Sequence, residues 1–124
     1  MTTEDYVSFE TAKLLKEKGF YQDFYNSLIP VWHYNGNKKV LSFTEDDGYP
    51  SEIQEWYSAP TLQMAMKWLR EVHKLYMYTA FAGMEEVWFS RIYNKDKHLK
   101  DLDDFNTYEE ACEAAIKYCL ENLI

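Results

Sequence analysis

The sequence predicts an α+β fold, in which a mainly antiparallel four-stranded sheet packs against helices. Three observations predict this class. Three segments combine helical periodicity with recognisable caps, four short segments are rich in β-branched and aromatic residues, and these four come as two adjacent pairs. No repeat or Gly/Ser-rich linker divides the chain, so we expect one domain over residues 1–124. The predicted order is α-β-β-α-β-β-α.

The first helix is expected over residues 8–18. Ser8 suits the N-cap, where a side-chain oxygen accepts a backbone N–H. Gly19 suits the position after the helix, which needs a positive φ. Leu15 and Phe20 then occupy the two positions that touch in a Schellman ending.

Two further helices follow from apolar stripes and caps. Residues 60–74 begin with Pro60, which suits a first helical turn. The last helix begins at Thr107, which forms a capping box with Glu110. The stripes consist of Leu62, Ala65, Met66, Leu69, Val72 and His73 in the first case, and of Tyr108, Ala111, Cys112, Ala115, Ile116, Cys119 and Leu123 in the second.

The strands are expected at residues 29–34, 38–43, 76–82 and 86–93. Asn35–Gly36 between the first two is a strong hairpin signal, because both residues tolerate positive φ. The region around Gly83 connects the second pair, most simply as another hairpin. Residues 44–59 are expected to form a long acidic connection, in which Trp56 and Tyr57 indicate that part of it packs down.

Charge restricts the class of partner. The chain has 13 Lys and Arg against 21 Asp and Glu, a net charge of −8. Binding to a phosphate backbone or an anionic membrane surface relies on basic residues, so we expect neither nucleic acid nor membrane as a partner. The acids concentrate in residues 44–56 and 101–113. No apolar run approaches 18 residues and the acidic N-terminus lacks an apolar signal core, which favours a cytoplasmic protein.

The two cysteines, Cys112 and Cys119, lie seven residues apart in one predicted helix. Seven helical residues rise about 10 Å, whereas a disulfide needs Cα atoms within roughly 7 Å. We therefore expect two buried, reduced thiols, as in a reducing compartment.

No catalytic, cofactor or metal site is predicted. His33, His73 and His98 show no metal-ligand spacing, and His73 is expected to be a core or interface histidine with a satisfied hydrogen bond. Nucleophile-elbow and phosphate-loop motifs do not occur. The acid pairs could act as general acid and base, but each falls at a predicted turn or strand end, where acids are simply solvated. They are Asp46–Asp47, Glu85–Glu86 and Asp103–Asp104.

Aromatic residues make up 18% of the chain, and aromatic side chains dominate both cores and interfaces. Those on or near the strands are the candidate interaction surface. An RNA-stacking sheet would need flanking basic residues that this chain does not have. The candidates are Trp32, Tyr34, Trp56, Tyr57, Tyr76, Tyr78, Trp88 and Tyr93.

Three stretches carry a resemblance: YVSFETAKLLKEKGF (6–20), APTLQMAMKWLREVHK (59–74) and FNTYEEACEAAIKYCLENLI (105–124). Together they resemble a family of small phage, prophage and mobile-element proteins of gut anaerobic bacteria. That family brings no assigned activity, cofactor or catalytic residue. The resemblance implies a cytoplasmic accessory protein of a mobile element.

Three hypotheses of function follow. The leading one is a non-catalytic protein-interaction module, which binds a protein partner or a second copy of itself through exposed aromatics. The second is an acidic mimic of nucleic acid that blocks a DNA-binding protein, and it requires the acids to line one face. The third is a small enzyme that uses the acid pairs with His33 or His73, and it requires them to converge.

Overall fold

The computed structural model describes residues 5–20, 30–42 and 56–124. The predicted α+β class is confirmed: the described residues form three α-helices and two three-stranded antiparallel sheets. The chain divides into two compact units, Met1–Thr61 (unit 1) and Leu62–Ile124 (unit 2). That residues 1–124 form one domain stays a prediction.

Unit 1 begins with α1 (Phe9–Glu17), and its caps are those that the sequence predicts. The Ser8 side chain accepts the backbone N–H of Thr11 at 3.2 Å. At the other end, Gly19 has φ 96° and the Phe20 N–H donates to the Leu15 carbonyl at 2.9 Å. This is the backbone bond of a Schellman ending.

The sheet of unit 1 has the order β2-β1-β3, with β1 at Val31–Asn35, β2 at Lys38–Ser42 and β3 at Trp56–Ser58. The β1–β2 hairpin occurs where the sequence predicts it, but Asn35 pairs with Lys38, so the loop is Gly36–Asn37, one residue later than expected. Gly36 has φ 65°, a conformation that glycine adopts at no steric cost.

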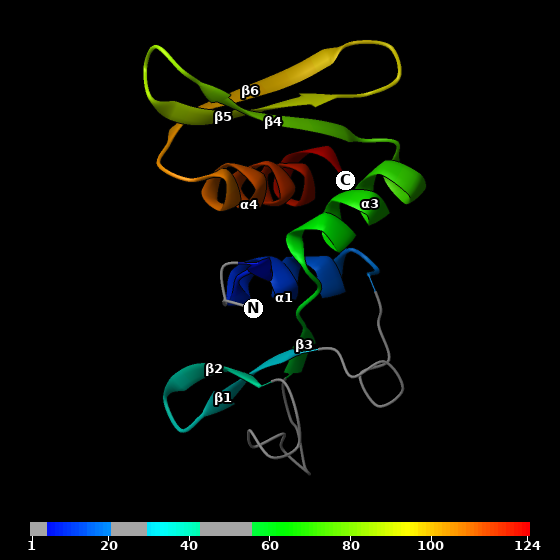
Figure 1. Cartoon of the computed structure of the whole chain (residues 1–124). Coiled ribbons are helices and arrows are strands. Elements are labelled where there is room, and N and C mark those ends of the chain that lie inside the picture. Colours follow the sequence, from blue (N-terminus) through cyan, green and yellow to red (C-terminus); the bar gives the residue numbers. More distant parts are fainter. Residues whose placement is uncertain (1–4, 21–29, 43–55) are drawn as a thin grey trace. The chain divides into compact units, whose positions relative to one another are not determined.

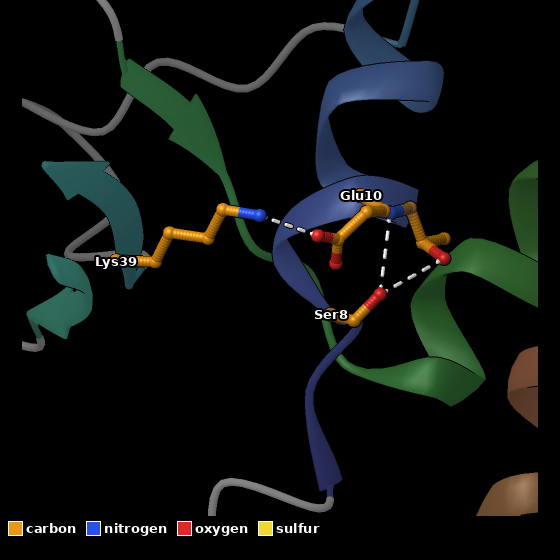
Figure 2. A network of polar contacts seen from close by, with 4 residues as sticks. Ser8, Glu10 and Lys39 are labelled. Carbon is orange, nitrogen blue, oxygen red and sulfur yellow. Dashed lines mark hydrogen bonds and ion pairs between the residues drawn. The ribbon is translucent and has the colours of Figure 1, made fainter. Parts of the chain in front are cut away.

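An aromatic cluster around Phe9 holds α1 against this sheet. The Phe9 ring meets the rings of Trp32, Tyr34 and Tyr57 edge-on, with centroids 6.2, 5.2 and 5.3 Å away. The Trp32 indole N–H donates to the Val7 carbonyl at 2.8 Å. At the surface, Lys39 Nζ of β2 lies 2.6 Å from Glu10 Oε1 of α1 (Figure 2). Their hydrogen bond raises the pKa of Lys39, but the pair is exposed, so it adds little stability.

Unit 2 contains α3 (Leu62–His73), β4 (Tyr76–Ala82), β5 (Val87–Tyr93), β6 (His98–Phe105) and α4 (Tyr108–Tyr118), which ends in a π-helical turn over Cys119–Leu123. The strand order is β4-β5-β6, and α4 runs along one face of this sheet (Figure 1). Thr107 caps α4 as predicted, since its side chain accepts the Glu110 N–H at 3.1 Å.

The single four-stranded sheet of the sequence analysis is wrong, and so is the order that went with it. Two strands were missed. β3 lies at the end of the segment expected to be a connection, and it pairs with β1 through Tyr57 opposite Trp32. β6 lies in a charged stretch for which no strand is predicted, and it pairs with β5. Both are edge strands: β3 has only three residues, and the polar sequence of β6 carries little β propensity.

Candidate interaction surface

The two faces of the unit 2 sheet differ in what covers them. Side chains alternate between faces along each strand, so the pairs Thr79–Ser90 and Met77–Ile92 share one face. Ser90 and Ile92 are fully buried there, and the Ser90 hydroxyl donates to the Ala111 carbonyl of α4 at 2.8 Å. This face is therefore the helix side.

The opposite face carries the other set of pairs. Tyr76 opposes Tyr93, Tyr78 opposes Arg91, and Ala80 opposes Phe89. β6 extends the rows, because Asp101 opposes Arg91 and His98 opposes Tyr93. We call this set the open sheet face, and no helix of unit 2 lies over it (Figure 1). It consists of Tyr76, Tyr78, Ala80, Phe89, Arg91, Tyr93, His98 and Asp101.

Large side chains of the open sheet face are accessible to solvent. Tyr78 is 56% exposed and Tyr76 40%. The side chain of Arg91 is 49% exposed and that of His98 is 45% exposed. Phe89 and Tyr93, on the central strand, are half-buried. The face therefore offers aromatic area that could still be removed from water.

Contacts between neighbours order these side chains. His98 Nε2 lies 2.6 Å from Asp101 Oδ1, and because a carboxylate only accepts, this nitrogen carries the proton. Arg91 Nε lies 3.5 Å from the same oxygen, and its guanidinium lies over the Phe89 ring at 5.1 Å. The Tyr93 and His98 rings meet edge-on with centroids 5.2 Å apart. Asp101 therefore balances the positive charge of this face.

The eight aromatics selected from the sequence lie in three kinds of place. Tyr76, Tyr78 and Tyr93 are on the open sheet face. Trp88 is half-buried on the helix side, against Tyr108 and Phe81. The other four belong to unit 1: Trp32, Tyr34 and Tyr57 meet Phe9, and half-buried Trp56 has Lys16 Nζ 4.8 Å from its ring centroid.

Besides Ala80, four members of the open sheet face were missed from sequence. Phe89 and Arg91 could have been found, because they share one face of the predicted strand 86–93 with Tyr93 by simple alternation. His98 and Asp101 could not, since their place depends on β6 and on its register with β5.

The two histidines of the enzyme hypothesis, His33 and His73, have different surroundings. His33 is buried in unit 1, where Nδ1 donates to the Tyr34 carbonyl (3.1 Å) and Nε2 therefore accepts from the Ser42 hydroxyl (2.7 Å) in the neutral ring. This resembles the contact between a nucleophile and its base, but Ser42 is fully buried. His73 meets Trp68 edge-on, and its buried Nε2 has no hydrogen-bond partner among the described residues, so the hydrogen bond expected for this side chain is absent at that nitrogen.

The acids of the second acidic segment, residues 101–113, do not form one row. Residues 43–55 lie outside the described residues, and Asp46–Asp47 with them. In the second segment, Asp101 lies on the open sheet face, whereas Glu109 and Glu110 lie in the first turn of α4. Glu85–Glu86 and Asp103–Asp104 are exposed.

The described residues contain no group of three His, Cys, Asp or Glu side chains placed to hold a metal ion. None of their helices has the length and apolarity needed to cross a membrane.

The fold and the surface together define an α+β protein whose unit 2 presents an aromatic sheet face opposite its helices. Comparison of the chain with protein-family models, with curated proteins and with solved structures finds no match.

Proposed function

We propose that this chain is a non-catalytic protein-interaction module that binds its partner through the open sheet face. The observation that carries the proposal is the composition and exposure of that face: three tyrosines, a phenylalanine and an arginine lie together, opposite the helix side. Tyr and Arg are enriched in protein interfaces and among the residues that dominate binding energy.

The charge of the face supports a protein partner over a nucleic acid. Arg91 is the one Arg or Lys in the set, and Asp101 pairs with it. Binding to phosphates needs several unpaired basic groups, and the chain as a whole carries a net charge of −8. Flat, ordered aromatic side chains instead suit an apolar protein surface with a polar rim.

The setting we propose is a phage or other mobile element. It rests on the resemblance of residues 6–20, 59–74 and 105–124 to small proteins of such elements, and it includes an accessory role in the cytoplasm. The partner would then be a host protein or a protein of the same element.

The test is affinity capture from lysate of the native host, with bound proteins identified by mass spectrometry. The key variant is Phe89→Ala/Arg91→Ala, which removes the centre of the open sheet face and leaves both sheet edges unchanged. The matched control is Lys95→Ala/Asp96→Ala, two exposed residues between β5 and β6. We expect a stoichiometric partner with the unmodified chain and the control, and its loss with the key variant.

Two results would contradict the proposal. One is a partner retained equally by Phe89→Ala/Arg91→Ala, and the other is recovery of the chain with no partner. Absorbance at 260 nm in the eluate would identify bound nucleic acid, which a net charge of −8 disfavours.

A further inference from the structure

β4 is an edge strand of the unit 2 sheet. β5 lies on one side of β4 and no strand of unit 2 lies on the other. β4 reads Tyr-Met-Tyr-Thr-Ala-Phe-Ala, with no charge and no proline. Its register with β5 runs without a break from Tyr76↔Tyr93 to Ala82↔Val87. A regular, uncharged edge presents unpaired backbone N–H and C=O groups to any strand that can reach it.

The other edge of the same sheet is protected in the usual ways. β6 reads His-Leu-Lys-Asp-Leu-Asp-Asp-Phe, and its register with β5 shifts twice. At one shift, Asp103 and Asp104 together oppose Phe89, and Asp104 takes φ 71°. Charges and bulges of this kind prevent strand addition. In this sheet the β6 edge thus carries charges and bulges that prevent strand addition, whereas the regular, uncharged β4 edge can pair with a further strand.

Exposed apolar side chains gather at the same edge. The described residues contain seven exposed large hydrophobics, and four of them lie in β4 or the turn after it: Tyr76, Tyr78, Phe81 and Met84. Tyr76 and Tyr78 are on the open sheet face, whereas Phe81, 49% exposed, is on the helix side opposite Trp88. β4 therefore exposes apolar surface on both of its sides.

We propose that β4 pairs antiparallel with β4 of a second copy, so that two units 2 share one six-stranded sheet. This pairing goes beyond the proposed function, because it depends on the backbone groups at the edge of β4 and not on the side chains of the open sheet face. In a closed dimer the two-fold axis stands perpendicular to the sheet. The register that uses all seven residues of β4 places that axis at Thr79, which then opposes the partner's Thr79.

The β4 sequence is self-complementary in this register. On the open side, Tyr78 opposes the partner's Ala80 and Tyr76 opposes the partner's Ala82, so each ring lies beside a small residue. On the helix side, Met77 opposes the partner's Phe81. Directly opposed side chains are the pairs that stabilise a sheet, and no like charges meet.

The charges at the ends of β4 favour the same partner. Lys74 precedes β4, and Glu85 and Glu86 lie in the turn that follows it. Antiparallel pairing brings the start of one β4 beside the end of the other, so each Lys74 comes beside the partner's Glu85 and Glu86. A second copy thus supplies apolar, steric and charge complementarity together.

The register is tested by a mixed disulfide. Tyr78→Cys and Ala80→Cys variants, carrying different tags, are co-expressed, purified, oxidised and separated on non-reducing gels. Opposed Cβ atoms lie about 4.5–5.5 Å apart, close to the roughly 3.5–4.5 Å of a disulfide, whereas diagonal ones lie about 7–8 Å apart. Cys112 and Cys119 are buried and give little background. We expect a linked dimer that carries both tags, and little dimer from either variant alone.

The oligomeric state gives a second, independent test by sedimentation velocity. We expect the unmodified chain to dimerise as its concentration rises. Ala80→Lys, which places a charge beside the partner's Tyr78, should abolish the dimer, whereas the matched control Asp103→Lys on β6 should not. Circular dichroism checks that each variant is folded. Phe89→Ala/Arg91→Ala should still dimerise, which separates this proposal from the proposed function.

Two outcomes would overturn the proposal. One is an unmodified chain that stays monomeric up to about 1 mM, the weak limit of specific association. The other is a mixed cysteine sample that cross-links no more than the single variants do.

Discussion

Two buried groups, the Ser90 hydroxyl and the Cys112 thiol, and the half-buried Thr79 hydroxyl connect the sheet of unit 2 to α4. The Ser90 hydroxyl must donate to the Ala111 carbonyl, because a carbonyl cannot donate. Ser90 therefore accepts from Thr79 at 2.8 Å, and Thr79 in turn accepts from the Cys112 thiol at 3.6 Å. Each group has one available role, so the direction of the whole chain of bonds is fixed.

This network predicts a measurable coupling between Thr79 and Ser90. Ser90→Ala leaves the half-buried Thr79 hydroxyl without its acceptor, which should lower the free energy of unfolding by about 1 kcal/mol. Thr79→Val keeps the shape of the side chain and should also destabilise. The double variant should lose less than the sum of the two losses, as urea unfolding would measure. Simple additivity would show that the two hydroxyls act independently.

The two cysteines should be inert in the folded protein. Burial raises the pKa of the Cys119 thiol to about 12, and burial is also the main reason why the pKa of Cys112 is raised. Thiolate is the reactive form, so we expect a thiol reagent at pH 8 to label neither residue until the chain is unfolded by denaturant. Rapid labelling of the folded chain would contradict this.

The raised pKa of Cys119 predicts that the free energy of unfolding falls at alkaline pH. Below about pH 9 the Cys119 thiol is protonated in both the folded and the unfolded chain, and its contribution to the free energy of unfolding is fully present. Between pH 9 and 12 the unfolded chain releases this proton and the folded chain keeps it, so the free energy of unfolding falls by up to about 1.4 kcal/mol per pH unit. Cys119→Ala should reduce this slope relative to the unmodified chain, as urea unfolding at several pH values would show.

At the scale of the elements, the C-terminal end of α1 shows how much stability depends on the backbone conformation of one residue. Gly19 has φ 96°, and a Cβ added there would meet no atom within 4 Å. Gly19→Ala should therefore destabilise by about 1–2 kcal/mol through backbone strain alone. Gly83 has the same free space but lies outside the left-handed region, so Gly83→Ala is the matched control and should be neutral or slightly stabilising. Equal thermal unfolding temperatures for the two variants would contradict this account.

Local signals explain which elements could be predicted from sequence. The bounds of β4 were predicted and those of β5 nearly so, because apolar and aromatic residues occur where the strand needs them, and the caps at Ser8, Gly19 and Thr107 are recognisable without tertiary information. β6 could not be predicted, since Lys100, Asp101 and the bulged acids have low β propensity and their strand exists through pairing with β5.

The candidate site, like the elements, could be predicted only in part. Tyr76, Tyr78 and Tyr93 were selected as surface aromatics, but the sequence could not separate them from Trp32 and Tyr57, which help to form the core of unit 1. That distinction depends on which face a helix covers, a property of packing that periodicity alone does not contain.

At the scale of the whole molecule, the two compact units raise the question of how much of the chain unit 2 needs in order to fold. Residues 62–124 include Leu62, Leu69, Ile92, Ala115, Ile116 and Leu120, all of them buried. They also include both partners of every bond in the Cys112–Thr79–Ser90–Ala111 network and all three strands of one sheet. A unit of about 60 residues buries less of its surface than a larger domain, but many domains of about this size fold alone.

We therefore expect a fragment of residues 62–124 to fold by itself. Its circular dichroism should show helix and strand, and its urea unfolding should be cooperative, because the buried set and the polar network are retained. The fragment carrying Ser90→Ala is the matched control, and its midpoint should fall as it does in the full chain. An unfolded fragment would instead mean that the core of unit 2 depends on residues 1–61, and would favour the single domain that the sequence predicts.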